Sequence, residues 1–197
     1  RAILDGRKDA TRKIVKGFIP DDAVWGYTAF TPKGYISCRG TFADGYGEKF
    51  FKLPCEPGDI LYVRETWKKA LNGYYYYEAW QRNDIADVTK WKPSIRMPKE
   101  AARIWLKVTN VRVERLQEIT DEQAKREGIQ YDECPTGFTW KQETDMHNCY
   151  TTPIGAMQAL WNSTIKKSDL DGYGWDANPW VWTIEFERCE KPEEISG

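Results

Sequence analysis

Two stretches of this chain alternate apolar and polar residues with a period of two, and this constrains the fold more than any other feature. Within residues 101–116, apolar side chains recur at alternate positions on either side of a short polar break. They are Ile104, Leu106, Val108, Val111 and Val113. In residues 180–186, Val181, Thr183 and Glu185 alternate with Trp182, Ile184 and Phe186. This periodicity is typical of β-strands, because alternate residues of a strand face opposite sides of a sheet.

Shorter signals predict the remaining elements. Residues 34–38, 60–65 and 74–79 read as strands bounded by Gly, Pro and Asp, whereas 91–99, 129–152 and 172–179 should be loops or turns. A helix should follow Thr120 as N-cap, with Gln123 completing a capping box, and should end at Gly128; a second helix should span 154–165. Residues 1–13 resemble the end of a short helix that stops at Gly6 and enters a basic turn.

Strands dominate this pattern and no βα repeat is present. We therefore predict an α+β fold, a small β-barrel with two to three flanking helices, rather than an alternating α/β sheet. A chain of 197 residues fits one domain, expected over residues 1–190, with insertions at about 21–52 and 131–152 and a flexible tail at 191–197.

Charge limits the kind of ligand. The 29 Lys and Arg nearly balance 30 Asp and Glu, giving a formal net charge of -1. A protein that coats duplex nucleic acid is usually more basic, so a nucleic-acid site would be a local patch or a pocket for one nucleotide. Ten Trp and eleven Tyr can fill a core or stack on bases.

Cysteine usage and hydropathy predict a cytoplasmic protein. There is no apolar run of membrane-spanning length and no signal peptide. The five cysteines are scattered, without a C-x-x-C pair, which favours reduced thiols. Cys134, His147 and Cys149 lie close in sequence, but they lack the paired spacing of a metal site, so an irregular loop that happens to hold them is the favoured interpretation. We expect no metal and no cofactor.

The densest candidate site is the segment 6–13, where Arg7, Lys8, Arg12 and Lys13 surround Thr11. An anion or nucleotide can dock on such a segment. In a turn or helical start, Lys8 and Thr11 would face one pocket, and a partly buried lysine near other cations can activate a hydroxyl nucleophile. The alternative is a solvated basic turn.

Two further candidates follow along the chain. Arg64, Glu65 and Trp67 leave a predicted strand, and Arg with Trp can hold a base; the alternative is an ion pair beside a core tryptophan. Glu127 ends the predicted helix, where the dipole disfavours a carboxylate and so favours a proton carrier. The alternative there is an ordinary surface glutamate.

These segments together resemble the ASCH family of the PUA-like superfamily. Gly6-Arg-Lys-x-x-Thr11 is similar to the family's G-x-K-x-x-T signature, and 57–65 (PGDILYVRE) to its G-D-x-L-x-V strand. Segments 119–128 and 180–186 follow in the family's order, and the longer motifs around Trp67 and Trp180 resemble phage and prophage members.

The resemblance implies a PUA-like barrel whose cleft meets RNA or a modified nucleoside. It also implies a likeness to bacterial acetylcytidine amidohydrolases: Thr11 would be the nucleophile, Lys8 would activate it, and Glu127 would move a proton or orient the substrate. Two features depart from the family. Asp9 stands where a Thr is usual and would hold Lys8 protonated, and this sequence begins inside the expected first helix, without the strand that precedes it in the family.

Three functions follow as hypotheses. The first is an enzyme, either an amidohydrolase of acylated cytidine or a ribonuclease, which requires Lys8, Thr11 and Glu127 to converge. The second is a non-catalytic module that binds RNA or a modified base, which requires a positive, aromatic cleft around Arg12, Arg64 and Trp67. The third is a phage accessory factor acting through protein contacts, whose sign would be an exposed apolar patch away from the cleft. The expected setting is the cytoplasm of a bacterial or phage-infected cell, with no membrane contact.

Overall fold

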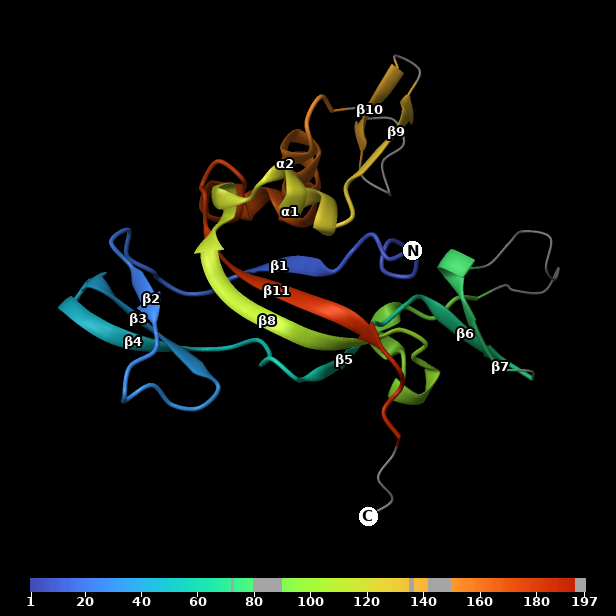
Figure 1. Ribbon diagram of the computed structural model, residues 1–197, viewed down its shortest axis with the longest axis horizontal. Coiled ribbons are helices and arrows are strands. Elements are labelled where there is room, and N and C mark those ends of the chain that lie inside the picture. Colours follow the sequence, from blue (N-terminus) through green and yellow to red (C-terminus); the bar gives the residue numbers. More distant parts are fainter. Residues whose placement is uncertain (72, 80–89, 135–136, 142–149, 194–197) are drawn as a thin grey trace.

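A curled antiparallel sheet of four strands forms the middle of the computed structural model (Figure 1). The structure describes residues 1–71, 73–79, 90–134, 137–141 and 150–193. In spatial order, the strands of the curled sheet are β1 (Ala10–Ile14), β11 (Trp180–Cys189), β8 (Trp105–Arg115) and β5 (Ile60–Tyr62). The chain is therefore a strand-rich α+β protein with few helices, as the sequence pattern predicts.

The two alternating stretches form the longest strands, β8 and β11, which pair along their length with one bulge between Glu185 and Phe186. Both faces of β11 are covered. Val181 packs with α2 and its neighbours, whereas Trp182 and Ile184 pack on the opposite side of the sheet. The alternation thus divides two apolar clusters rather than a core and a solvent face.

A three-stranded meander covers the Trp182 side of the curled sheet. Its strands are β2 (Val24–Gly26), β3 (Tyr35–Phe42) and β4 (Gly45–Lys52), in that spatial order. Trp25 packs edge-on against Phe51, Trp180 and Trp182, so aromatic rings join the two sheets. This meander occupies most of the predicted insertion at 21–52.

The hairpin β6 (Trp67–Ala70) and β7 (Gly73–Tyr76) lies at the other end of the molecule (Figure 1). Short 3-10 turns at Tyr77–Ala79, Ser94–Arg96 and Lys99–Ala101 continue it, in agreement with the loop predicted at 91–99. Trp67, Met97 and Trp105 form the buried cluster that attaches this hairpin to β8.

Helices cover the Val181 face of the curled sheet. They are α1 (Asp121–Arg126), α2 (Pro153–Thr164) and the short α3 (Leu170–Tyr173), with 3-10 turns at Leu116–Glu118 and Lys167–Asp169. The predicted capping box is confirmed: the Thr120 hydroxyl accepts from Gln123 N, and the Gln123 side chain accepts from Thr120 N. Beyond α1, Gly128 has φ +99°, and a Cβ there would lie 3.2 Å from Ala2 Cβ.

Two local predictions were wrong. Residues 1–13 are not a helix end followed by a turn; residues 2–6 form a turn closed at Gly6 (φ +72°), and 10–14 form β1. Pairing with β11 outweighs the local turn signal, because Ala10 and Arg12 face a buried surface there. Residues 129–152 are also not all irregular, since β9 (Gln130–Cys134) and β10 (Gly137–Lys141) form a hairpin. Tyr131 and Trp140, paired across it, provide a stabilising contact.

Within the described residues, no helix is long and apolar enough to span a membrane.

Candidate functional site

Lys8 and Glu127, two of the three predicted catalytic residues, lie together. They form an isolated antiparallel bridge, and Lys8 Nζ lies 3.1 Å from the Glu127 carbonyl oxygen and 3.9 Å from Glu127 Oε2. Glu127 is the C-cap of α1 and only 6% exposed. It is thus not the ordinary surface glutamate that the sequence alone would suggest.

Arg12 joins this pair from the same side of the sheet. Its side chain is fully buried and its guanidinium forms ion pairs with Glu127 and Glu114. Arg12 Nη2 also lies 3.3 Å from the Gln123 side-chain oxygen, so α1 and β8 are tied to β1 through one cation. Arg12 Nε has no hydrogen-bond partner in the described part of the chain.

The ion pairs continue along the covered face of the sheet. Arg112 pairs with Glu114 and Glu185, and Arg126 links Glu185 to Asp9, with Arg126 Nε 2.8 Å from Asp9 Oδ1. Together with Lys8, Arg12 and Glu127, these residues make eight, which we call the ion network: Lys8, Asp9, Arg12, Arg112, Glu114, Arg126, Glu127 and Glu185. Asp9, predicted to hold Lys8 protonated, binds Arg126 here.

Two carboxylates of the ion network, Glu114 and Glu185, are stabilised in their charged form. Burial alone would raise the pKa of Glu114, but the Thr183 hydroxyl at 2.8 Å and the cations Arg12 and Arg112 lower it below its ordinary value. For Glu185, too, burial alone would raise the pKa, but Arg112 and Arg126 lower it below its ordinary value. Such groups hold elements together and are poor proton donors near neutral pH.

Thr11 lies on the other face of β1. Ala10 and Arg12 alternate with Thr11 and Lys13 along the strand, and Thr11 pairs in register with Ile184, whose side chain belongs to the cluster under the meander. Among the described residues, the Thr11 hydroxyl has no hydrogen bond to Lys8 or Glu127. The strand therefore brings Lys8 and Glu127 together and directs Thr11 away from them, while Lys13 is exposed.

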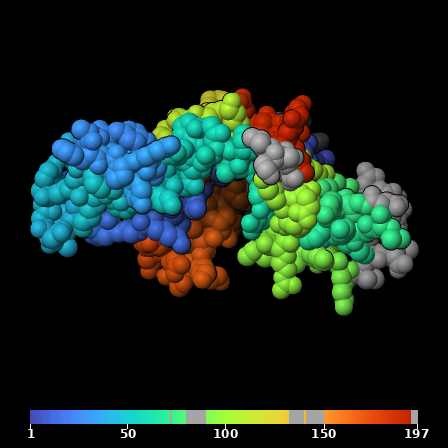
Figure 2. All heavy atoms as spheres, turned by 90° about the horizontal axis from the view of Figure 1, so that it is seen from below, coloured from blue at the N-terminus to red at the C-terminus, as the bar shows by residue number. Residues whose placement is uncertain are grey.

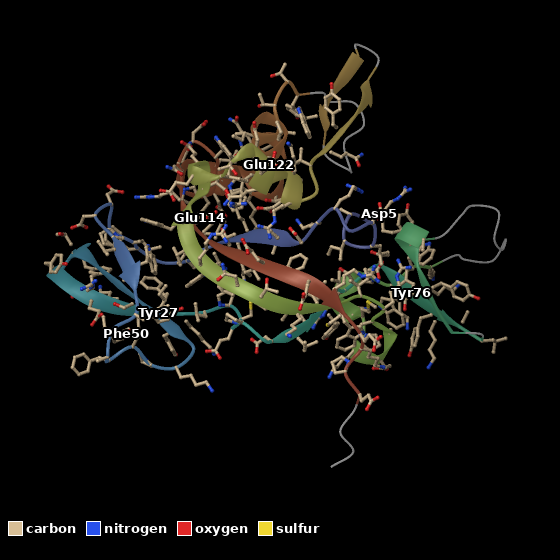
Figure 3. All side chains as sticks on the ribbon, in the orientation of Figure 1. Asp5, Tyr27, Phe50, Tyr76, Glu114 and Glu122 are labelled. Carbon is tan, nitrogen blue, oxygen red and sulfur yellow. The ribbon has the colours of Figure 1, made fainter. Side chains whose placement is uncertain are left out.

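A cavity of about 480 Å³ opens beside the ion network, between the first turn, α1 and the β9–β10 hairpin. Its polar lining combines Arg7, Lys125 and Arg126 with Asp9 and Glu122. Figure 3 shows Glu122 on the helix at this end of the sheet, and Asp5 in the first turn.

Two aromatic rings form the far wall of the cavity. Tyr131 and Trp140 lie with their ring centroids 5.0 Å apart, and Lys125 Nζ is 5.1 Å from the Trp140 ring centre. Tyr131 is 57% exposed. Arg7, a predicted binding residue, lies opposite and donates to the Gly128 carbonyl oxygen at 3.4 Å and to Asp5 at 3.1 Å.

The second predicted cluster lies elsewhere, at the β6–β7 end. Glu65 accepts two hydrogen bonds from Arg103, at 2.9 and 2.6 Å, and Trp67 is 5% exposed in the buried cluster there. Arg64 is exposed and contacts the Tyr62 hydroxyl at 3.2 Å. Of the interpretations weighed for this cluster, the observed geometry is that of an ion pair beside a core tryptophan, with Arg64 open to solvent.

A cluster of three or more metal-ligating side chains is absent from the described residues. The side chains of Cys134, His147 and Cys149, which the sequence brought forward for a metal, lie outside them. Cys38, Cys55 and Cys189 are free thiols.

Apolar side chains are exposed on the meander, far from the cavity. Tyr27, Phe30 and Tyr46 are 67, 81 and 75% exposed, and Figure 3 shows Tyr27 and Phe50 at this end of the molecule.

Sequence reasoning missed the aromatic wall and half of the ion network, namely Arg112, Glu114, Arg126 and Glu185. A signal for the network was present: Arg112 and Glu114, two apart on one strand, and Thr183 and Glu185, two apart on the other, share a face once the strands pair. Finding it requires the register of β8 on β11. The sequence pattern did not indicate the aromatic wall, because it predicts an irregular insertion at residues 131–152 rather than a hairpin.

Fold and site together define a strand-rich α+β protein with a curled sheet, a buried ion network on its helix-covered face and a cationic, aromatic cavity beside it. No protein-family model, curated protein or solved structure matches this chain, so the likeness to ASCH domains depends on the motifs alone.

Proposed function

We propose that this chain is an ASCH-like module that binds RNA nucleotides or a modified nucleoside in the cavity between the first turn, α1 and the β9–β10 hairpin. The observation that carries the proposal is the cavity lining. Rings of Tyr131 and Trp140 offer a stacking wall, and Arg7 and Lys125 supply donors on the remaining sides. A volume of about 480 Å³ is within the usual range for small-ligand sites.

The polar lining suits a nucleoside better than a bare anion. Arg126 is held by Asp9 and Glu185, and Lys125 by Glu122 at 2.6 Å, so much of the positive charge is already balanced. The carboxylates Asp9 and Glu122 can accept hydrogen bonds from sugar hydroxyls or an exocyclic amine. Specificity would come from these groups, and affinity from stacking.

Calorimetric titration tests this proposal with cytidine, N-acylated cytidine, uridine and their 5′-monophosphates. Tyr131→Ala should weaken binding about tenfold, because one stacking contact is worth about 1–3 kcal/mol. Tyr46→Ala, which removes an exposed tyrosine ring from the meander, is the matched control and should bind like the wild type. No measurable binding by the wild type, or equal losses in the two variants, would refute the proposal.

Amide hydrolysis on an acylated cytidine is the second candidate, favoured by the contact between Lys8 and Glu127. It ranks behind binding because Thr11 faces the other side of β1, away from Lys8 and Glu127. If the wild type releases acetate or RNA fragments and Lys8→Met does not, the enzyme hypothesis would rank ahead of binding. Retention of that turnover in Thr11→Ala would exclude Thr11 as the nucleophile.

A further inference from the structure

Positive charge is concentrated at the β6–β7 end of the molecule. Residues 64–79 and 90–103, here called the basic lobe, contain eight of the chain's 29 Lys and Arg but only three of its 30 Asp and Glu. The cations are Arg64, Lys68, Lys69, Lys90, Lys92, Arg96, Lys99 and Arg103. Figure 2 shows this lobe (green) at one end of the molecule and the meander (blue and cyan) at the other. These two segments are therefore strongly basic, although the formal net charge of the whole chain is -1.

Aromatic rings, not carboxylates, accompany the exposed cations of the lobe. The ammonium of Lys92 lies 4.8 Å from the Trp67 ring centre, that of Lys69 5.7 Å from Tyr74, and that of Lys99 5.7 Å from Trp105. Within the described residues, none of these three lysines forms an ion pair. A ring attracts a cation without cancelling its charge, so these lysines keep their capacity to bind phosphate.

The carboxylates of the lobe do not cancel this surface. Glu65 is taken up by the bidentate contact with Arg103, whose guanidinium carbon also lies 4.1 Å from the Tyr76 ring centre. The hydrogen bond to Glu65 is the main cause that raises the pKa of the Arg103 guanidinium. Glu78 and Glu100, the two other carboxylates of these segments, compare with six exposed cations: Arg64, Lys69, Lys90, Lys92, Arg96 and Lys99.

An exposed aromatic side chain stands beside these charges. Tyr77 is 53% exposed and packs edge-to-face with Trp91, ring centroids 5.4 Å apart, and Trp91 is flanked in sequence by Lys90 and Lys92. Exposed cations with an exposed ring nearby offer contacts to both the phosphates and the bases of a single strand. An acidic protein would be attracted by the charges but gains less from the ring.

From this arrangement we infer that the basic lobe binds the backbone and a base of a single-stranded nucleic acid. The surface is separate from the nucleoside cavity and uses no residue of it, so the inference goes beyond the proposed function and does not depend on it. It assigns a ligand role to Arg64, a predicted binding residue that the cavity does not use.

Fluorescence anisotropy with a labelled 12-nucleotide single-stranded RNA, titrated at several KCl concentrations, tests the inference. Each phosphate contact contributes about 0.7 to the slope of log affinity against log salt for single strands. The triple variant Lys69→Gln, Lys92→Gln, Lys99→Gln should therefore lower that slope by about 2 and weaken binding at least tenfold at low salt. Tyr77→Ala should weaken binding about tenfold with the slope unchanged.

A second triple variant provides the matched control. Lys16→Gln, Lys33→Gln, Lys52→Gln removes the same charge from exposed positions outside the lobe and should bind like the wild type. Equal losses in the two triple variants, or no binding of any oligonucleotide, would overturn the inference. Single-stranded DNA bound as tightly as RNA supports it, whereas polyglutamate that competes as well as RNA at equal charge would assign the lobe to an acidic protein.

The same variants separate this inference from the cavity proposal. The lysine variants of the lobe should bind mononucleotides like the wild type, and Tyr131→Ala should keep most of its affinity for the RNA strand. Loss of mononucleotide binding in the lobe variants would place both ligands on one surface and refute the lobe as an independent site.

Discussion

Replacing Arg12 by Met should destabilise the protein strongly, because Arg12 is the cation on which the ion network depends. Its side chain is fully buried and forms ion pairs with Glu127 and Glu114, whose side chains are 4 and 12% exposed. Met fills much of the same space without a charge. The variant therefore leaves two carboxylates buried with part of their compensation removed.

The expected loss is about 3–5 kcal/mol in the free energy of unfolding, the usual cost of breaking a buried ion pair on one side. In this variant Arg112 still pairs with Glu114, the Thr183 hydroxyl still donates to it, and Lys8 Nζ still lies 3.9 Å from Glu127 Oε2. These remaining contacts favour the lower part of that range. With a denaturant slope of about 2 kcal/mol per M, the urea midpoint should fall by about 1.5–2 M. Far-UV circular dichroism in urea, at pH 7, measures it.

Two controls show whether charge is the cause. Lys49→Met removes the cation of an exposed pair with Asp44 and should cost less than about 1 kcal/mol. Adding Glu114→Gln and Glu127→Gln to Arg12→Met should recover part of the stability, since no carboxylate is then left uncompensated. A loss in Arg12→Met no larger than in Lys49→Met would refute the reasoning, and a triple variant weaker than the single one would assign the loss to packing.

Three further predictions concern titration and packing. The pKa of Glu114 in the folded protein lies below its ordinary value of 4.5, so its contribution to stability is complete above about pH 4.5 and is lost as the pH falls through the folded pKa. Below about pH 4.5, the free energy of unfolding should therefore fall less steeply with pH in Glu114→Gln than in the wild type. Gly40→Ala should cost about 1–3 kcal/mol, since its Cβ would lie 2.7 Å from Pro20 Cγ, whereas Gly47→Ala, opposite it in register with nothing within 4 Å, should be tolerated in the same urea titration. Burial, and to a lesser extent the charge of Asp22, raises the pKa of the Cys38 thiol to about 11. A variant that keeps Cys38 as its one cysteine should therefore react with a disulfide reagent at pH 8 far more slowly when folded than when unfolded in guanidinium. Equal rates in the two states would contradict the burial of Cys38.

Local sequence patterns were sufficient for elements whose signal and final environment agree. Alternation placed β8 and β11, and the capping box placed α1, because Thr120 and Gln123 satisfy each other's backbone within one turn. The same approach was wrong for residues 10–14. Four cations around a threonine look like a solvated turn, yet pairing with β11 makes this segment a strand and buries Arg12.

The candidate site was predictable only in part, for a related reason. Lys8 and Glu127 are 119 residues apart, and the motif resemblance selected both, but only pairing of the segments shows that they touch. The direction of the Thr11 side chain depends on the alternation of faces along β1. A turn would direct it toward Lys8, whereas a strand directs it away. Tyr131 and Trp140 form a cavity wall only because β9 and β10 pair, and nothing in the spacing of the residues indicated that hairpin.

The identity of each cation's neighbour decides which cations are available to a ligand, and this cannot be judged from the count of charges. Arg12, Arg112 and Arg126 lie among carboxylates, so they hold β1, β8 and α1 together and have little capacity left for an anion. Lys69, Lys92 and Lys99 of the basic lobe lie against aromatic rings, which attract a cation without cancelling its charge. Arg12, in the densest basic segment of the sequence at 6–13, is therefore structural, and the cations that we propose for a polyanion are Lys69, Lys92 and Lys99 of the basic lobe.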